Sequence, residues 1–356
     1  MKRILCSMLL LIALHCTQAQ SYVTYIDSFA KAAGFNGVVL IQEKNKLSYQ
    51  KSFGYANLSF KIPSSVDTKY KIASITKLFT SVLIMQLYEQ GRLELSSTIG
   101  KYLPEYKGEA KDKVTVHQLL NHTSGISNMD TVTSFESALN NGLPPYQHPY
   151  TLTEVMDKFC SGKLVKAPGS RFDYNNADYV ILSRIIEKLY NQSYDSVLQQ
   201  NILKPLQLKN TGVLHQRDMP AGLADTYFYR DDLGRLAPDF PVYPENWYGA
   251  GSMYSTVADL LQFSNALFGI KLLKAASLDK MFLSGKGEYG YGVWVYEDYD
   301  IKGTMYRIIK RPGMIMGAQS MLFHIEGTGS TIILLSNTGN ISLDEFAAKI
   351  AANIQL

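Results

Sequence analysis

Cysteine is scarce in this chain of 356 residues, which contains three: Cys6, Cys16 and Cys160. The first two lie in an N-terminal segment, residues 1–19, which has a basic start, a short apolar run and small residues ahead of Ala19. That pattern is typical of a cleaved export signal. Once the segment is removed, Cys160 stands alone and cannot form an intramolecular disulfide. We therefore expect the mature fold to depend on its hydrophobic core.

Two alternatives to a cleaved signal peptide can be weighed from the same segment. Its apolar run is shorter than the roughly 20 residues that a membrane-spanning helix needs, which disfavours a membrane anchor. A lipoprotein cut before Cys16 is disfavoured because bulky His15 stands where a small residue is wanted. We expect a signal peptide over residues 1–19, a secreted or periplasmic protein, and no stable membrane span after cleavage.

Concentrated charge, repeats and low-complexity tracts are also lacking. The 35 Lys and Arg residues exceed the 31 Asp and Glu residues by 4, and by 33 minus 31, or 2, after Lys2 and Arg3 are lost. The chain has no basic cluster of the kind that binds nucleic acid, so no nucleic-acid partner is expected. With 46% hydrophobic and 19% charged residues, it is expected to form a single globular domain over residues 20–356.

Two common hydrolase signatures are missing as well. No serine has glycine two positions before and two positions after it, which excludes the nucleophile elbow of α/β-hydrolases. The six histidines form no His-Glu-x-x-His motif, so a zinc hydrolase is not indicated. The sequence therefore predicts neither a metal site nor a cofactor.

Strand patterns occur near both ends of the chain. The segment 37–57 alternates and predicts a hairpin that turns near Asn45. Residues from about 92 to 280 are mostly helical in pattern. A sheet built from both ends of the chain, with a helical insertion between them, is the economical arrangement. Further helices are expected near 22–33 and 343–354, and further strands at 289–297, 304–313, 318–326 and 330–337.

Ser-x-x-Lys occurs four times, beginning at Ser28, Ser48, Ser74 and Ser277. A serine hydroxyl needs a neighbouring base to become a nucleophile. A lysine, with a free pKa of about 10.4, becomes a usable base near neutral pH only after its pKa falls by roughly 3 units. Burial supplies such a shift and exposed solvent does not. The chemically competent pair must therefore be buried.

One pair meets that requirement. Ser74 opens an almost continuously apolar helix, residues 74–89, that stops before Gly91, and Lys77 follows one turn later. The other three pairs fall in an amphipathic helix, in a strand where positions i and i+3 face opposite sides, and in a polar helix. Ser74 as a plain helix cap is the alternative that this window alone leaves open.

Other motifs in the chain favour the chemical interpretation. In their order and spacing they resemble the serine β-lactamase and penicillin-binding protein superfamily, in its branch of class C β-lactamases, D-alanyl-D-alanine peptidases and esterases, over about residues 35–340. They are SITK at 74–77, VHQLLNHTSGI at 116–126, PGSRFDYNNADY at 168–179, GAGSMYSTVADLLQF at 249–263 and RPGMIMG at 311–317.

The resemblance implies an α+β, β-lactamase/transpeptidase-like fold with a central antiparallel sheet. An α/β lobe would hold residues 20–73 and 285–356, and a mostly helical lobe residues 74–284. It also implies acyl transfer through a covalent intermediate on Ser74, with Lys77, Tyr174 or both taking the serine proton.

Substrate contacts follow from the resemblance in the same way. Asn176 would bond the carbonyl side of the substrate, and backbone N–H groups of Ser74 and Met314 would form the oxyanion hole. The turn around His122 is structural in that branch. The substrate would be a small molecule or peptide, a β-lactam, a D-amino acid peptide or an ester, with cell-wall material among the sources. A binding or sensor domain that acylates without turnover is the alternative function.

Arg311-Pro312-Gly313 departs from the Lys-Thr-Gly or His-x-Gly that the family usually carries. Pro312 has no backbone donor, so the strand should be an edge or face the cleft there. Lys310 is displaced by one residue and would point to the opposite face. We expect Arg311 to lower the pKa of Lys77 or to bind a substrate carboxylate, with Gly313 beside it; a surface arginine at a strand end is the alternative.

Removal of the signal can be tested directly. The intact mass of the exported chain should correspond to a start at Gln20 or Ser21. A cytoplasmic chain that retains Met1 would contradict the export signal.

Overall fold

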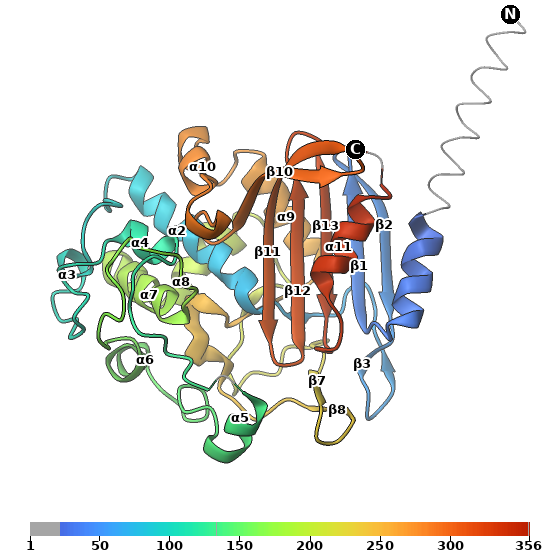
Figure 1. Cartoon of the computed structure of the whole chain (residues 1–356), viewed down its shortest axis with the longest axis horizontal. Helices are drawn as coiled ribbons and strands as arrows, with labels where there is room; N and C mark the ends of the chain where they lie inside the picture. The colour runs from blue at the N-terminus through green and yellow to red at the C-terminus, as the bar shows by residue number, and fades with distance from the viewer. Residues whose placement is uncertain (1–21, 133, 355) are drawn as a thin grey trace, which may run out of the picture.

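The computed structural model describes residues 22–132, 134–354 and 356, so the expected signal peptide lies outside the described residues. A six-stranded antiparallel sheet, in the order β10-β11-β12-β13-β1-β2, forms the centre of the molecule (Figure 1). Its strands come from both ends of the chain, as expected from the sequence. They are β1 (Gly37–Glu43), β2 (Lys46–Phe53), β10 (Trp294–Ile301), β11 (Thr304–Ile315), β12 (Ala318–Ile325) and β13 (Ser330–Ser336).

The neighbouring strands β1 and β13 are buried on both faces because helices cover each side of the sheet. Val39 and Ile41 pack with residues of the helix over residues 22–32 and of α11 (Leu343–Ala351). Val38 and Leu40 alternate with them and join the core on the other face, where α9 (Val257–Phe268) lies against β1 and β13. The hairpin between β1 and β2 turns at Asn45, where φ is +63°, which confirms the predicted turn.

A mostly helical insertion separates the strands of the two ends of the chain (Figure 1). Its helices are α2 (Thr76–Glu89), α3 (Ile99–Tyr102), α4 (Val116–Leu120), α5 (Phe135–Asn141), α6 (Leu152–Phe159), α7 (Asn176–Tyr190), α8 (Tyr194–Leu198), the π-helical η2 (Gln199–Leu203), the 3-10 turn η3 (Pro244–Ala250), α9, α10 (Ala275–Met281) and η4 (Lys286–Glu288).

Short strands pair within and beside this insertion. They are β3 (Tyr55–Asn57) with β4 (Ile62–Pro63), β5 (Tyr70–Lys71) and β6 (Gly212–Val213) on either side of β9 (Met253–Ser255), and β7 (Tyr227–Arg230) with β8 (Arg235–Pro238). The lobe boundaries near residues 73/74 and 284/285 stay predictions.

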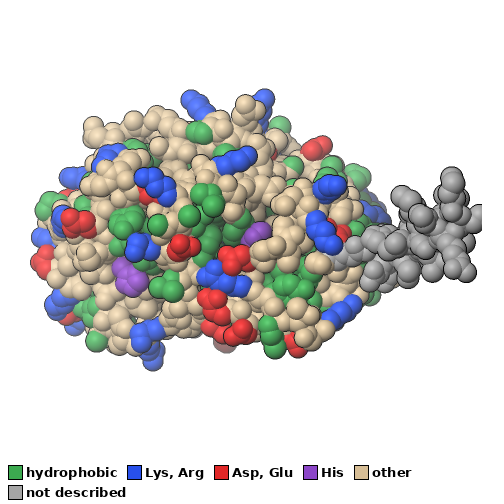
Figure 2. All heavy atoms as spheres, turned by 90° about the horizontal axis from the view of Figure 1, so that it is seen from above, with side chains coloured by type: hydrophobic (Ala, Val, Ile, Leu, Met, Phe, Trp, Pro, Cys, Tyr) green, Lys and Arg blue, Asp and Glu red, His purple; other side chains and the backbone are tan. Residues whose placement is uncertain are grey.

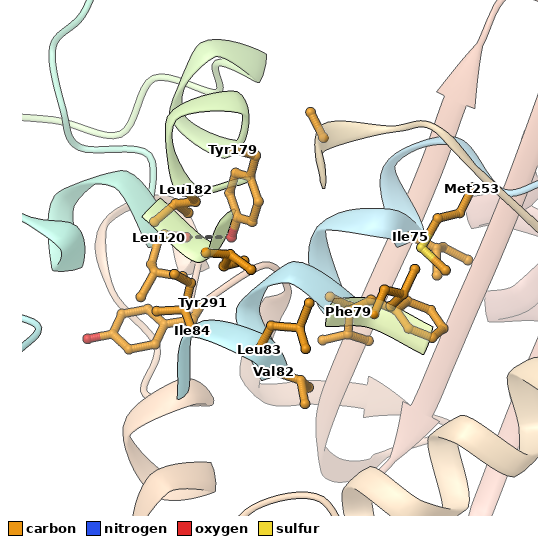
Figure 3. Close-up of a cluster of buried hydrophobic side chains, with 14 of the residues drawn as sticks. Ile75, Phe79, Val82, Leu83, Ile84, Leu120, Tyr179, Leu182, Met253 and Tyr291 are labelled. Atoms are coloured by element: carbon orange, nitrogen blue, oxygen red, sulfur yellow. Dashed lines mark hydrogen bonds between the residues drawn. The ribbon is translucent and has the colours of Figure 1, made fainter. Parts of the chain in front are cut away.

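Helix α2 forms the centre of the larger core and is buried around its whole circumference. Figure 3 shows four of its apolar side chains, with α7 on one side and Met253 on the other; they are Phe79, Val82, Leu83 and Ile84. The ring of Phe79 stacks on that of Phe263 from α9, with 3.8 Å between centroids. The helix ends at Glu89, and Gly91 follows with a φ of +68°, as a glycine after a helix terminus does. The predicted buried helix is confirmed.

One predicted strand begins later than expected. Residues 289–293 form a loop, and β10 starts at Trp294. Gly292 explains the difference, because its φ of +80° breaks the extended backbone and a Cβ there would lie 2.6 Å from Ser81 Oγ on α2. The loop thereby packs directly on the central helix. No helix within the described ranges is long and apolar enough to cross a membrane.

The stacked pair in the core makes a stability prediction. Phe79→Ala removes a fully buried ring, so it should lower the free energy of unfolding by about 3–5 kcal/mol in a urea titration. Phe60→Ala is the control, because the side chain of Phe60 is 81% exposed and its loss should change stability by about 0.5 kcal/mol or less. Equal effects of the two variants would contradict this description of the core.

Candidate active site

Ser74 lies in a single 3-10 turn, η1 (Ala73–Ile75), that leads directly into α2. Ala73 has a φ of +45°, a left-handed conformation that costs a non-glycine residue free energy and persists only where its surroundings hold it. Two hydrogen bonds anchor the turn. The Ser320 hydroxyl donates to Ile72 O at 2.7 Å, and the Thr76 hydroxyl donates to Ala73 O at 2.7 Å. The fold therefore fixes the backbone on both sides of Ser74.

Lys77 is fully buried, one turn after Ser74. Its ammonium group donates to Ser74 Oγ at 3.3 Å, to Asn176 Oδ1 at 2.6 Å and to Ala250 O at 2.8 Å. Burial lowers the pKa of Lys77 to about 8; the positive charge of Arg311 acts in the same direction and Tyr174 opposes them. This is the buried lysine that the sequence argument requires.

Tyr174 lies on the other side of Ser74. Its hydroxyl donates to Ser74 Oγ at 2.9 Å, and the ammonium of Lys77 lies 4.8 Å from its ring centroid. Burial alone would raise the pKa of Tyr174, but the positive charges of Arg311 and Lys77 outweigh it and lower the pKa to about 8. Lys77 and Tyr174 therefore titrate as a pair. One proton can lie on either group, which gives neutral lysine with neutral phenol or ammonium with phenolate.

Arg311 is also fully buried, so it is not a surface arginine at a strand end. Its guanidinium donates from Nη2 to the Tyr174 hydroxyl at 2.6 Å, from Nε to Ser74 O at 2.6 Å and from Nη1 to the Tyr289 hydroxyl at 2.8 Å. Lys310, one residue earlier, forms an ion pair with Asp344 at 2.6 Å instead. This geometry supports a role for Arg311 in tuning the pKa of both Lys77 and Tyr174.

Gly313 and Met314 lie on a free edge of the sheet beside Ser74. Strand β11 pairs with β10 only as far as Lys310, so residues 311–315 are hydrogen-bonded to β12 alone, as expected for a strand that contains Pro312. A Cβ on Gly313 would lie 2.9 Å from Ser74 N and 2.5 Å from Ile72 O. The missing side chain lets this edge approach the backbone of the serine turn, where an oxyanion hole would need it.

Asn176, the first residue of α7, connects Lys77 to a residue that the sequence motifs did not reveal. Its amide oxygen accepts from Lys77, and its amide nitrogen donates to Asp130 Oδ2 at 2.7 Å. Asn176 therefore bridges Lys77 and Asp130 through the two ends of its amide group. Asp130 lies 46 residues before Asn176 in a segment without a motif, so only the fold could place it here.

The turn around His122 holds the segment that carries Tyr174. His122 O accepts from the backbone N–H of Asp173 at 2.8 Å, and His122 Nδ1 lies 2.9 Å from Asp178 Oδ2. Its ring centroid is 4.4 Å from that of Tyr174. Burial lowers the pKa of His122 well below its usual value and raises the pKa of Asp178 well above its own. Burial therefore disfavours the charged form of both groups, and the hydrogen bonds of the turn hold the segment that carries Tyr174.

The cleft at Ser74 has a volume of about 320 Å³. Its lining includes Tyr174, Gly313 and Met314, together with Trp294, which the sequence motifs also missed and whose ring stacks on that of Tyr174 at 5.9 Å. Elsewhere, a hollow of about 590 Å³ is lined by residues of α9 and α10 and of the turn between β12 and β13, with none from the Ser74 group. Figure 2 shows the end of the molecule where that turn lies, with charged side chains beside hydrophobic ones near the middle of the face. The candidate site is therefore identified by the side chains around Ser74, because the cleft there is smaller than the hollow beside α9 and α10.

Residues suited to hold a metal do not gather here. Across residues 22–132 and 134–354, no group of three or more His, Cys, Asp or Glu side chains could hold a metal ion. The groups that surround Ser74 are a lysine, an arginine, phenols and amides. Their chemistry is that of proton transfer and hydrogen bonding to a substrate.

Comparison with solved structures places the fold. A penicillin-binding protein from Bacillus halodurans superposes with a TM-score of 0.78 at 23% identity, covering 92% of this chain and 99% of that one. A D-stereospecific amidohydrolase from Streptomyces sp. superposes with a TM-score of 0.77 at 24% identity, covering 95% and 98% of the two chains. The fold is therefore the α+β fold of β-lactamases and penicillin-binding proteins, as the sequence resemblance implied.

Sequence comparison then identifies the family. Penicillin-binding protein 4* of Bacillus subtilis (strain 168) is 29% identical over 340 residues, which cover 88% of this chain and 70% of that protein. The sequence model of the Beta-lactamase family matches residues 24–355. The chain belongs to the Beta-lactamase family, whose members are serine hydrolases.

The cations around Tyr174 make a prediction about pH. If the rate rises as the base with a pKa of about 8 loses its proton, Arg311→Ala should move that rise to higher pH. Loss of the guanidinium raises the pKa of Tyr174, since a charge that favours phenolate is gone, and raises the pKa of Lys77, since a like charge is gone. The pH profile of kcat/KM for an ester measures the shift.

Two further variants complete this experiment. Arg311→Lys keeps a positive charge and should shift the profile less than Arg311→Ala. Arg307→Ala removes a cation from the same strand, where it binds Glu297 and Glu326 at the surface, and should leave the profile unchanged. An unshifted profile in a folded Arg311→Ala variant would mean that burial alone tunes the base.

Proposed function

We propose that this protein is a secreted serine hydrolase that cleaves an amide, ester or β-lactam carbonyl through an acyl-enzyme on Ser74. The observation that carries the proposal is the position of Ser74 Oγ, which lies 2.9 Å from the Tyr174 hydroxyl and 3.3 Å from Lys77 Nζ in a buried setting. A serine held between two groups whose pKa values are both lowered to about 8 is poised to lose its proton near neutral pH.

In the proposed acylation step, Ser74 Oγ forms a bond to the carbonyl carbon while its proton passes to Tyr174 or Lys77. The negative charge that develops on the carbonyl oxygen would be met by the backbone N–H groups of Ser74 and Met314. The tetrahedral intermediate then collapses, the bond to the leaving group breaks, and the same base returns the proton to that group. In the second half-reaction, water attacks the carbonyl carbon of the ester on Ser74 while the base accepts a proton from the water. The bond from that carbon to Ser74 Oγ then breaks, the base returns the proton to Oγ, and the acid product leaves.

The serine proton has two possible acceptors, because the Tyr174 hydroxyl and the Lys77 ammonium group both bond to Ser74 Oγ. With ammonium and phenolate, the phenolate of Tyr174 takes the serine proton and Lys77 stabilises the charges. With neutral lysine and neutral phenol, the amine of Lys77 takes it. Arg311, whose charge is permanent, bonds to the Tyr174 hydroxyl and favours the phenolate form.

Export is the second part of the proposal, and it rests on the signal pattern of residues 1–19. A secreted or periplasmic enzyme would meet amide and ester substrates outside the cytoplasm, among them peptides derived from the cell wall. The relative from Bacillus subtilis carries the name of a penicillin-binding protein, which agrees with this class of substrate.

Covalent labelling tests the proposal. A fluorescent fluorophosphonate or penicillin should label the purified mature chain, and peptide mapping should place the adduct on Ser74. Ser74→Ala should abolish labelling. Ser48→Ala is the matched control, because Ser48 is also followed by lysine three positions later but lies on β2 and bonds to Ile41 O. Labelling that persists in Ser74→Ala would refute the assignment.

Turnover separates a hydrolase from the sensor alternative. After labelling with a cleavable substrate such as nitrocefin or a p-nitrophenyl ester, a hydrolase recovers free Ser74 and releases product repeatedly. A protein that stays acylated after one equivalent of product would be a sensor.

A further inference from the structure

The two buried cations beside Ser74, Arg311 and Lys77, both donate hydrogen bonds to groups within the protein. Arg311 is fully buried, with its donors on Tyr174, Tyr289 and the backbone of Ser74. Lys77 is fully buried as well. A substrate carboxylate that approached the cleft would have to displace these internal bonds to reach either charge.

Lys310 is the remaining cation at this end of β11. Its ammonium group forms an ion pair with Asp344 at 2.6 Å, and its side chain is 15% exposed whereas that of Asp344 is 53% exposed. The outer member of the pair is therefore the carboxylate. Asp344 lines the Ser74 cleft, and Lys310 is not among the lining residues.

The rest of that side of the cleft is apolar. Trp294 at the start of β10, Met314 on the edge of β11, and Ile341 and Leu343 near the N-terminus of α11 line the same hollow as Ser74. Met314 is 65% exposed, although the exposure of an apolar side chain to water is unfavourable. An uncharged, apolar group of a substrate would bind favourably to this wall, because contact removes apolar surface of both from water.

The N-terminus of α11 offers no vacant place for an anion. A helix N-terminus attracts negative charge, but the first turn of α11 already carries two carboxylates, Asp344 and Glu345, and its N-cap is Ser342. A third negative charge from a substrate would meet the exposed carboxylate of Asp344 in the cleft, and the two like charges would repel each other.

We infer that the Ser74 site selects neutral esters or amides whose group beside the reacting carbonyl is apolar, and that it discriminates against substrates with a carboxylate there. This inference rests on the proposed function, since it names the substrate class of the same site. It replaces the carboxylate-binding role for Arg311 that the sequence left open. Asp344 is the specificity-determining residue, because it gives the apolar wall a negative end.

Matched substrate pairs test the inference on the purified mature chain. One pair differs on the acyl side: 4-nitrophenyl butyrate and the mono-4-nitrophenyl ester of succinic acid. The other differs on the leaving group: the butyrate esters of methyl 4-hydroxybenzoate and of 4-hydroxybenzoate. Each kcat/KM is divided by the rate of imidazole-catalysed hydrolysis. The neutral member should be favoured by about tenfold or more in at least one pair. A smaller preference in both pairs overturns the inference.

Two variants of α11 identify the source of the discrimination. Asp344→Asn should raise kcat/KM for the disfavoured carboxylate substrate by about threefold to tenfold relative to kcat/KM for its neutral partner. Glu345→Gln is the matched control on the same helical turn, where Glu345 pairs with Lys349, and it should change neither substrate. No gain in Asp344→Asn, or an equal gain in Glu345→Gln, would remove Asp344 from the proposal.

Failure of this inference can be told apart from failure of the proposed function. If Ser74 is labelled and neutral and charged esters turn over equally well, the hydrolase assignment stands and the selectivity is wrong. If Ser74 is not labelled and no ester turns over, the proposed function itself has failed.

Discussion

Two cations, Lys77 and Arg311, lie fully buried around one phenol, Tyr174, and the rest of the site depends on that arrangement. Taking two positive charges out of water is costly, and their proximity adds repulsion. The protein offsets this cost with backbone carbonyls, through Ala250 O for the ammonium and Ser74 O for the guanidinium. The part of the cost that is not offset appears in the pKa values. Burial and the charge of Arg311 lower the pKa of Lys77 to about 8, and the charges of Arg311 and Lys77 lower the pKa of Tyr174 to about 8.

Such a site requires walls that pack closely on the central helix, and glycines at three places allow it. A Cβ on Gly249 would lie 2.5 Å from Thr80 Oγ1, one on Gly292 would lie 2.6 Å from Ser81 Oγ, and one on Gly313 would lie 2.9 Å from Ser74 N. These glycines bring η3, the loop before β10 and the edge of β11 against η1 and α2. Water is thereby excluded from Lys77, and the pKa shift of its ammonium follows from the packing.

The same packing directs the donors of Arg311 to partners inside the protein. The planar fork of Arg311 turns inward to Tyr174, Tyr289 and the Ser74 carbonyl. A guanidinium has donors enough to bind three such partners at once, which a compact ammonium group in that geometry would not match. The outer side of the cleft is formed by Trp294, Met314 and the exposed carboxylate of Asp344, so the positive charges are buried while apolar side chains line the cleft.

The sequence by itself determined the strands at both ends of the chain, the buried helix after Ser74, and the motifs that single out Ser74, Lys77, Tyr174, Asn176 and Arg311. The strands and the helix follow from side-chain periodicity, and Ser74 with Lys77 from their place at the start of that helix. Tyr174, Asn176 and Arg311 were singled out by the resemblance of their motifs to those of the β-lactamase and penicillin-binding protein superfamily. Only the tertiary structure decided that Arg311 faces Tyr174, that Asp130 holds Asn176 and that residues 289–293 leave the strand pattern. It also placed Asp344 at the cleft. Such facts depend on which distant segments pack together, and a one-residue change of strand register would have exchanged the places of Arg311 and Lys310.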